Sequence, residues 1–283
     1  MAEAPQRRSR PVFRGSVLRT ERLTPHMIRV VLGGDLDGFT AGTYTDHYVK
    51  LVFPQDGTAL PEPFDLRRIR EELPRERWPR TRTYTVRHWD PDAGELTVDF
   101  VHHGDEGIAG PWAANARPGD QLLFTGPGGA YAPDPAAVWH LLAGDESALP
   151  AIAAAIERLA LEGDAVAHVF VEVADEREEQ KLQAPPGVRI TWLHRGDRPV
   201  GEALVAAVRA LPFPAGTPHV FVHGEANFVK ELRRYLRVER GIERERLSVS
   251  GYWRTGADED GWQASKSDWN RQVESEQEGG AAS

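Results

Sequence analysis

The apolar pattern of this 283-residue chain changes once, near residues 127–135. Before that point, short segments rich in Val, Thr, Tyr and Phe are separated by Gly, Pro and Asp, which is typical of antiparallel strands. After it, short apolar segments alternate with helical ones, which is typical of a parallel sheet with helices on both faces. The sequence therefore predicts two domains, a closed antiparallel β-barrel over residues 11–130 and a doubly wound α/β domain over residues 136–256.

The same patterns place the individual elements. Barrel strands are expected at residues 12–20, 27–34, 47–54, 82–89, 95–103 and 121–126. Strands of the second domain are expected at residues 138–145, 165–173, 188–194, 218–224 and 245–253, with helices at 148–163, 200–211 and 225–241. Two interruptions of the barrel, at 60–80 and 107–115, are each expected to hold a short helix. Residues 257–283 are expected to form a polar C-terminal tail with one helix over 265–277.

Composition and charge exclude several kinds of chemistry. The formal net charge of −9 argues against a general nucleic-acid binder, which needs a basic surface. The chain has no cysteine, which excludes disulfides, iron–sulfur clusters, thiolate zinc sites and cysteine nucleophiles. Redox chemistry would therefore need a bound organic cofactor or a diffusible metal complex.

Neither a membrane-spanning helix nor a secretory signal is expected. The longest apolar stretch, residues 149–161, contains Glu157 and Arg158 and is shorter than the ~20 residues that a spanning helix needs. The N-terminal segment has arginines but no apolar core behind them. A cytoplasmic protein is therefore expected, and we expect it to be a monomer.

Common catalytic motifs are absent from the sequence, among them G-x-S-x-G, the P-loop and H-E-x-x-H. The first strand of the second domain is not followed by G-x-G-x-x-G, but a helix that begins near Ser147 can still hold a phosphate through its backbone N–H groups and its dipole. His102 and His103 are adjacent in a strand, so their side chains point to opposite faces and cannot easily chelate one metal. No metal site is predicted. Two interpretations of the pair remain. In the first, one imidazole faces the barrel interior and the other faces outward; in the second, the histidines contact a cofactor.

The most informative segment is Arg82-Thr83-Tyr84-Thr85. In a strand, Arg82 and Tyr84 lie on one face while Thr83 and Thr85 lie on the other. An arginine, an aromatic ring and hydroxyls on a barrel strand suit a planar ring system with hydrogen-bonding edges and an anionic tail. Trp253, at the end of the last expected strand, either covers the core at a sheet edge or stacks on a planar ligand.

Further motifs follow this segment in order, namely DFVHHGDEGIAGPWA, GPGGAY, GDESALPAI, VFVHGEANFVKELRRYL and SGYWRTG. Together, over residues 11–256, they resemble the siderophore-interacting proteins, which are FAD-dependent ferric-siderophore reductases of the ferredoxin-reductase-like superfamily. The resemblance implies a flavin-binding β-barrel followed by a nicotinamide-dinucleotide-type α/β domain. This fold agrees with the one that the strand and helix patterns predict.

The resemblance assigns FAD-binding residues to four segments of the chain. It places an arginine beside the flavin, where a positive charge would stabilise the reduced ring and raise its potential. The segments are Arg82, Thr83, Tyr84 and Thr85 beside the isoalloxazine; Asp99, Phe100, Val101, His102 and His103 along the ring and ribityl chain; Ala109, Gly110 and Pro111 under the pyrophosphate; and Trp253 near the flavin or its adenine.

A nicotinamide dinucleotide is implied at the carboxyl ends of the parallel strands. Glu172 lies at the end of the strand expected at 165–173, and Asp175 and Glu176 follow that strand. Carboxylates there would bind a ribose 2′-hydroxyl and repel a 2′-phosphate, which predicts NADH rather than NADPH, unless these acids cap the next helix instead. The remaining residues that the resemblance assigns to the dinucleotide lie at two strand-to-helix turns, Asp145, Glu146, Ser147 and Ala148 at one and Gly224, Glu225 and Ala226 at the other.

The siderophore cleft that the resemblance implies departs from the family in one residue. Many members have G-P-R-G where this chain has residues 126–129, so that Gly128 stands in place of a cation. Lys50 and Arg254 are candidate siderophore contacts, although Lys50 is alternatively a solvated strand lysine. The lost cation and the acidic chain predict that ferric hydroxamates or mixed chelates are favoured over anionic tris-catecholates.

The implied function is the reduction of ferric siderophores to release Fe(II) during iron uptake. Electrons come from NADH, NADPH or a ferredoxin and pass through FAD. Reduction loosens the metal because hard-oxygen chelators hold Fe(III) better than Fe(II). Two alternatives are a general NAD(P)H–flavin oxidoreductase with another acceptor and a non-enzymatic siderophore carrier that has lost flavin.

Overall fold

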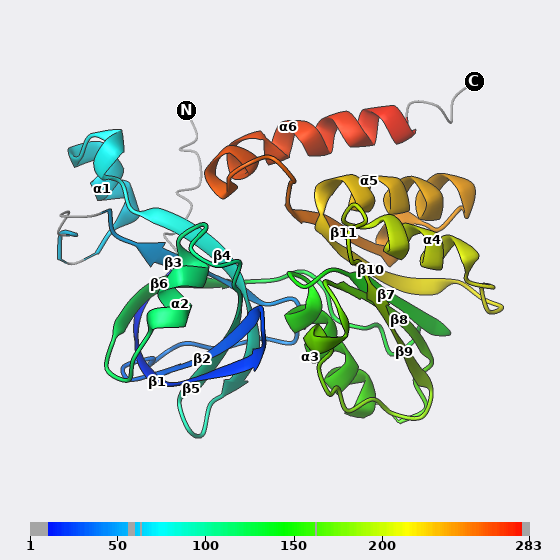
Figure 1. The fold of residues 1–283 in the computed structure, drawn as a ribbon, viewed down its shortest axis with the longest axis horizontal. Coiled ribbons are helices and arrows are strands. Elements are labelled where there is room, and N and C mark those ends of the chain that lie inside the picture. Colours follow the sequence, from blue (N-terminus) through cyan, green and yellow to red (C-terminus); the bar gives the residue numbers. More distant parts are fainter. Residues whose placement is uncertain (1–10, 56–59, 63, 162, 279–283) are drawn as a thin grey trace, which may run out of the picture.

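The computed structural model describes residues 11–55, 60–62, 64–161 and 163–278. Within these residues an antiparallel barrel lies beside a parallel sheet, and a long C-terminal helix runs above both (Figure 1). This architecture confirms the predicted fold class. The site must therefore be sought where the two domains and the last helix meet.

In the described part of the chain, six strands close the barrel in the order β1-β2-β5-β4-β3-β6. All neighbouring strands are antiparallel. The strands are β1 (Val12–Thr24), β2 (Met27–Gly33), β3 (Tyr48–Phe53), β4 (Arg80–Asp90), β5 (Glu95–Val101) and β6 (Gln121–Gly128).

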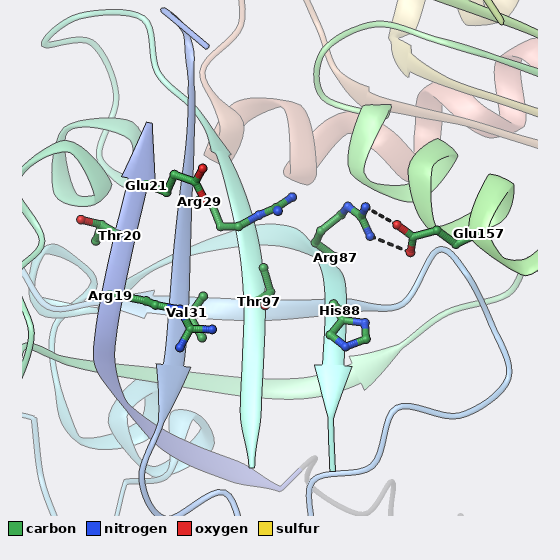
Figure 2. A pocket seen from close by; sticks show the side chains of 9 residues that line it. All are labelled: Arg19, Thr20, Glu21, Arg29, Val31, Arg87, His88, Thr97 and Glu157. Atoms are coloured by element: carbon green, nitrogen blue, oxygen red, sulfur yellow. Dashed lines mark hydrogen bonds and ion pairs between the residues drawn. The ribbon is translucent and has the colours of Figure 1, made fainter. Parts of the chain in front are cut away.

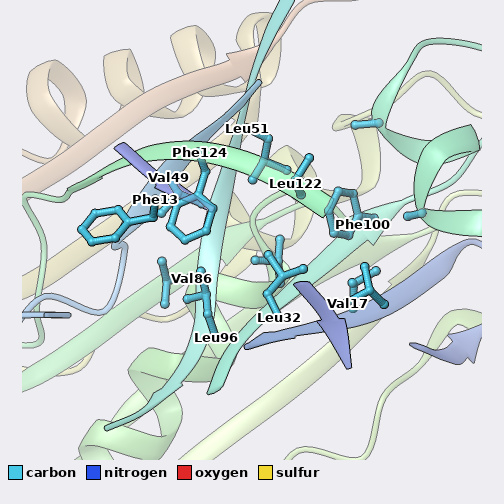
Figure 3. Close-up of a cluster of buried hydrophobic side chains, with 14 of the residues drawn as sticks. Phe13, Val17, Leu32, Val49, Leu51, Val86, Leu96, Phe100, Leu122 and Phe124 are labelled. Carbon is cyan, nitrogen blue, oxygen red and sulfur yellow. The ribbon is translucent and has the colours of Figure 1, made fainter. Parts of the chain in front are cut away.

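The barrel interior is filled by large apolar side chains from all six of these strands (Figure 3). Phe13 of β1 and Phe124 of β6 stack with their ring centroids 5.5 Å apart. Leu51 of β3 and Leu96 of β5 are fully buried. Because successive strand residues point to opposite faces, these side chains point inward while their neighbours point outward. The barrel is a packed core, so a ligand must bind at its rim.

Helices occupy the two expected interruptions of the barrel. Helix α1 (Leu66–Glu72) begins where the Asp65 carboxylate accepts a hydrogen bond from the Arg67 N–H at 2.8 Å, and the short helix η1 (Arg75–Arg77) follows it. Within this interruption, residue 63 lies outside the described residues. Helix α2 (Ala109–Asn115) packs on β2 and β5 at the end of the barrel.

The second domain is built on five parallel strands in the described part of the chain, in the order β11-β10-β7-β8-β9. From the central strand β7, the chain adds β8 and β9 on one side and then β10 and β11 on the other. Ligands of such sheets bind outside the carboxyl ends of the strands, where the order reverses. The strands are β7 (Trp139–Gly144), β8 (Ala167–Val173), β9 (Val188–His194), β10 (Pro218–Glu225) and β11 (Leu247–Trp253).

Helices cover both faces of this sheet (Figure 1). Helix α3 (Leu149–Leu161) packs with one set of strand side chains, and α4 (Glu202–Ala210) and α5 (Ala226–Arg234) pack with the other. This double covering explains the nearly continuous apolar sequence of the central strands. Short helical turns complete the domain at η2 (Glu176–Glu178), η3 (Tyr235–Glu239) and η4 (Arg244–Arg246).

Helix α6 (Glu259–Glu278) begins six residues earlier than the sequence pattern predicts. The Asp258 carboxylate accepts a hydrogen bond from the Gly261 N–H at 2.7 Å and so caps the first turn. Trp262 is 1% exposed, and Lys230 of α5 pairs with Glu276 at 2.7 Å. The helix therefore covers β11 and α5, and residues 279–283 of the expected tail lie outside the described residues.

Candidate functional site

A cavity of about 1130 Å³ lies where the barrel, the parallel sheet and α6 meet. The barrel contributes residues of β3, β4, the end of β5 and the segment after it. The sheet contributes the carboxyl end of β10 and most of the length of β11, and α6 contributes its first two turns. Both domains and the C-terminal helix thus build one site. The sequence-predicted residues that line it are Lys50, Arg82, Thr83, Tyr84, Thr85, Asp99, Val101, His103, Ala109, Gly110, Glu146, Ser147, Trp253 and Arg254.

The pairing of β3 with β4 brings the barrel side of the cavity together. Lys50 lies opposite Thr83, and Tyr48 lies opposite Thr85, and directly paired residues of antiparallel strands project from the same face. A side-chain hydrogen bond joins Thr85 to Tyr252 of β11, so this wall is tied to the second domain. The registers therefore place a lysine and two threonines in one row along the cavity.

Tyr84 projects from the other face of β4 and closes the barrel end. Its ring lies 4.5 Å from the Phe100 ring, measured between centroids. Burial raises the pKa of Tyr84 above its ordinary range, with Glu259 adding to the effect and Arg82 opposing it. The phenol is therefore neutral at physiological pH, and the ring provides a flat, uncharged wall.

Arg82 is held by the first turn of α6. Its guanidinium is 9% exposed and lies 3.1 Å from Asp260 Oδ1 and 3.2 Å from Glu259 Oε2. Glu259 also accepts a hydrogen bond from the Thr83 N–H at 3.0 Å. Burial raises the pKa of Glu259, while the hydrogen bond from Thr83 and the charge of Arg82 oppose the rise. The C-terminal helix therefore orients the arginine that the sequence assigns to the flavin.

Residues of α6 are the largest group that the sequence analysis missed. Trp262, Gln263 and Lys266 line the cavity together with Glu259. The segment is polar and follows the last recognisable motif, so its composition indicates a solvated tail. Two tryptophans in that polar segment, Trp262 and Trp269, are the sequence features that indicate a packed helix, and their ring centroids lie 5.3 Å apart.

The strand that carries Asp99 divides its residues between the cavity and the core. Asp99, Val101 and His103 line the cavity, whereas Phe100 is fully buried in the barrel core. Asp99 forms two hydrogen bonds with Arg29 across the β2–β5 pair, at 2.7 and 2.8 Å. The strand ends at Val101, so the two histidines follow it.

Of these two histidines, His103 lines the cavity and His102 does not. His102 Nδ1 is buried without a hydrogen-bond partner among the described residues.

A Cβ on Gly110 would lie 3.0 Å from the Val101 carbonyl oxygen, so a glycine lets α2 approach the end of β5. Pro111 does not line the cavity.

The turn after β7 places two residues in the cavity and one beneath it. Glu146 and Ser147 line the cavity, while Asp145 is fully buried and Ala148 lies in the core. At the turn after β10, Gly224, Glu225 and Ala226 do not line it. Glu225 instead caps α5, where it accepts a hydrogen bond from the Asn227 N–H at 2.6 Å.

Glu172 is the clearest departure from the residue roles that the sequence suggests. It is fully buried and accepts hydrogen bonds from the Gly201 N–H at 2.8 Å and the Leu204 N–H at 3.2 Å, which cap α4. Asp175 caps η2 through the Arg177 N–H at 2.9 Å. These contacts correspond to the helix-cap alternative, because both carboxylates accept hydrogen bonds from backbone N–H groups of the protein.

Because Glu172 is a buried cap, replacing it by glutamine is expected to lower the free energy of unfolding by about 2 kcal/mol. The substitution removes the charge that faces Arg195 at 3.4 Å and weakens the hold on α4. Urea unfolding measures the change, with the exposed Glu176→Gln as a matched control. Equal stability of the two variants would contradict the capping role.

A second hollow, of about 490 Å³, lies on the outer face of the barrel beside α3 (Figure 2). Its arginines are all matched by carboxylates. Arg19 pairs with Glu95 at 2.6 Å, Arg29 contacts Asp99 as described above, and Arg87 pairs with Glu157 at 2.5 Å. The last pair joins β4 to α3, so this hollow is a seam between the domains rather than a ligand site.

The described residues contain no helix that is long and apolar enough to cross a membrane. Among the same residues, no three His, Asp or Glu side chains are grouped so that they could hold a metal ion.

A closed barrel joined to a parallel α/β domain, with a shared cavity at the carboxyl edge of the sheet, defines a ferredoxin-reductase-like fold. A ferredoxin reductase of carbazole 1,9a-dioxygenase shares this fold at a TM-score of 0.62 and 17% identity, covering 83% of this chain and 68% of that one. Residues 16–131 match the siderophore-interacting FAD-binding domain, and residues 137–256 match the siderophore-interacting protein family. The chain belongs to the siderophore-interacting protein family, and FAD is its cofactor.

Similar proteins are known from several bacteria. The uncharacterized protein Rv2895c of Mycobacterium tuberculosis is 48% identical over 89% of this chain and 93% of its own length. The ferric vibriobactin reductase ViuB of Vibrio cholerae is 35% identical, covering 87% and 90%, and the NADPH-dependent ferric-chelate reductase of Escherichia coli is 33% identical, covering 84% and 91%. The crystal structure of a siderophore utilization protein from T. fusca has 40% identity and a TM-score of 0.75, covering 88% of this chain and 95% of that one.

Proposed function

We propose that this chain reduces ferric siderophores through FAD and so releases Fe(II). One observation carries the proposal: a single cavity brings the flavin-type segment of β4, the turn after β7 and two lysines together. The relatives named as ferric vibriobactin reductase and ferric-chelate reductase support the same reaction class. Because one chain supplies every wall of this cavity, the proposal needs only a monomer.

The residues present fit a bound FAD. Tyr84 offers a neutral aromatic face, Thr83 and Thr85 offer hydroxyls, and Arg82 offers a buried cation. Gly107, Ala109 and Gly110 leave backbone open to the cavity because their side chains are small. When bound, FAD would supply the ability to take two electrons from a donor and to pass them on one at a time. The protein's part is to hold the ring, to keep a positive charge near it and to exclude water from one face.

The donor is proposed to be a nicotinamide dinucleotide or a ferredoxin. Glu146 and Ser147 line the cavity at the carboxyl edge of the sheet, where a dinucleotide would enter. The name of the Escherichia coli relative supports NADPH for that protein. The proposal includes a cytoplasmic location, because reduced dinucleotides are supplied there.

Three basic side chains line the part of the cavity proposed for the acceptor, together with the carboxylate of Glu259. They are Lys50, Lys266 and Arg254, and Lys266 Nζ donates a hydrogen bond to Ser250 Oγ at 3.1 Å. Burial lowers the pKa of Lys266, and the charge of Lys50 lowers it further. These cations would attract an anionic or oxygen-rich chelate.

The glycine at position 128 is explained by packing and not by charge alone. A Cβ at this position would lie 2.4 Å from Tyr48 Cζ, so an arginine there requires Tyr48 to move. At the position where the resemblance implies a cation, this chain therefore has a glycine in close contact with a cavity tyrosine. The lack of a cation at this position is the basis of the proposed preference for hydroxamate or mixed chelates over tris-catecholates.

The proposed function is tested on the purified chain reconstituted with FAD. Anaerobic stopped-flow with NADPH and with NADH measures flavin reduction, and mixing with a ferric hydroxamate in the presence of an Fe(II) trap measures reoxidation. Rapid reoxidation with trapped Fe(II) is expected. Reduction of quinones without reduction of ferric siderophores would point to a general flavin oxidoreductase, and a chain that takes up no FAD would contradict the proposal.

Replacing Lys50 by glutamine is expected to raise KM for an anionic ferric tris-catecholate by about 3- to 10-fold, because one cation is lost from a partly exposed site. The KM for a near-neutral ferric hydroxamate should change less than about twofold by the same reasoning. Steady-state assays at low and high salt measure the difference. Lys181→Gln, an exposed lysine outside the cavity, is the matched control, and equal effects of the two substitutions would contradict the role of Lys50.

A further inference from the structure

We propose that Asp145 is a positioning residue, whose buried carboxylate holds the Trp253 indole as a wall of the cavity and is not a dinucleotide ligand. The inference deepens the proposed function, since Trp253 is one of the residues assigned to FAD. Trp253 and Ser147 line the cavity, whereas Asp145 lies beneath them with no exposed surface. The carboxylate therefore acts through its neighbours.

Four donors surround the two oxygens of this carboxylate. Oδ1 accepts hydrogen bonds from the Ser147 N–H at 2.9 Å and from Ser147 Oγ at 2.5 Å. Oδ2 accepts them from the Glu225 N–H at 2.8 Å and from Trp253 Nε1 at 2.8 Å. The ends of β7, β10 and β11 thus meet at one side chain.

These bonds leave the carboxylate no free capacity. An ionised carboxylate has about four lone-pair positions, and four donors fill them. A ribose hydroxyl or an amide of a dinucleotide would have to displace a backbone N–H or the indole. Such displacement leaves a buried donor without an acceptor, which is costly. Asp145 therefore belongs to the framework of the site.

The packing around Asp145 keeps it in place. Gly224 lies directly against it, since a Cβ there would come within 2.7 Å of Asp145 Cγ. Burial raises the pKa of Asp145 to about 6, with Glu146 adding to the rise and hydrogen bonds from Ser147, Trp253 and Glu225 opposing it. Four donors facing its two oxygens match the ionised form, which only accepts hydrogen bonds.

A second carboxylate anchors the same segment. Glu225 Oε1 accepts a hydrogen bond from the Thr255 N–H at 3.1 Å. Residues 253–255 are therefore tied at two points to the carboxyl edge of the sheet, just before the chain enters α6. Since an indole N–H is only a donor, its bond to Asp145 selects one orientation of the Trp253 ring.

The first test uses the FAD-free chain, so that it does not depend on the proposed function. Nuclear magnetic resonance measures the solvent exchange of the Trp253 indole proton. The signal of this proton is identified by its absence from the spectrum of the Trp253→Phe variant. Asp145→Ala is expected to accelerate this exchange about tenfold, because the acceptor is lost. Ser147→Ala, which removes the other side-chain donor from the same carboxylate, should leave it within about twofold by the same argument. Unchanged exchange in folded Asp145→Ala would overturn the inference.

The second test measures dissociation constants and serves also if Asp145→Ala fails to fold. Trp253→Phe keeps an aromatic ring but removes the donor, and it is expected to weaken FAD binding about 3- to 10-fold and to shift the visible flavin band. In the folded double variant, the effects of the two substitutions on the FAD dissociation constant should not be additive, because both substitutions break the same hydrogen bond. Additive effects would overturn the inference, because they would show that the two side chains act independently. A change in dinucleotide binding with flavin binding and indole exchange unaltered would show that Asp145 binds the dinucleotide directly.

Discussion

Replacing Arg82 by alanine is expected to weaken FAD binding by about 10- to 100-fold, because hydrogen bonds to a charged group contribute about 1.5–3 kcal/mol. The guanidinium lies in the cavity with 9% of its side chain exposed, so little water competes with a bound anion. The flavin potential should also fall, since a positive charge near the ring favours its reduced form. Titration of FAD into the stripped protein and a potential measurement on the reconstituted protein provide the two readouts.

Arg80→Ala is the matched control for this prediction. Arg80 lies on the same strand and lines the same cavity, but it is exposed. Its removal should change FAD affinity by less than about threefold, because exposed charges contribute little. Loss of Arg82 also leaves Glu259 and Asp260 without their partner, so the unfolding free energy of the FAD-free variant must be measured alongside. Unaltered FAD affinity in a stable Arg82→Ala protein would contradict the assignment.

Replacing Gly224 by alanine is expected to lower the free energy of unfolding by about 3 kcal/mol or more, combining backbone strain with overpacking. Gly224 has φ +138°, which favours glycine, and a Cβ would lie 2.6 Å from Phe228 Cζ and 2.7 Å from Asp145 Cγ. Neither neighbour can retreat easily, because Phe228 is in the core and Asp145 is held by four donors. Urea unfolding of the FAD-free chain measures the change.

Gly196→Ala is the control for Gly224 in the same domain. Gly196 also has a positive φ, +56°, but a Cβ there would meet nothing within 4 Å. Its replacement should cost only about 1 kcal/mol, from the left-handed backbone alone. If both substitutions cost the same, the close packing at Gly224 is not what requires glycine.

The sequence was sufficient for the architecture because strand and helix periodicity are local properties. Segments rich in Val, Thr, Tyr and Phe between turn residues, such as 95–103, indicate antiparallel barrel strands, and nearly continuous apolar runs such as 165–173 indicate a strand covered on both faces. The ordered motifs likewise specified the family and its FAD. These features depend on neighbours within a few residues, so no tertiary information was needed.

The tertiary structure decided which polar groups are free to act. Asp145, Glu172 and Glu225 all look available at the ends of strands, yet each is engaged by N–H groups, some of them distant in the sequence. Trp253 and Asp145, for example, are separated by 108 positions. A carboxylate that donors have already saturated cannot bind a ligand, and that saturation is invisible without the fold.

The closing of the cavity by α6 was likewise decided by the tertiary structure. The sequence by itself determined the barrel, the α/β domain and the cofactor, and it predicted the β4 residues that line the cavity. It could not determine that a polar tail turns back to hold Arg82 with Glu259 and Asp260. Contacts between residues so far apart in the chain carry no local periodicity, and only the packing of α6 on β11 brings their charges together.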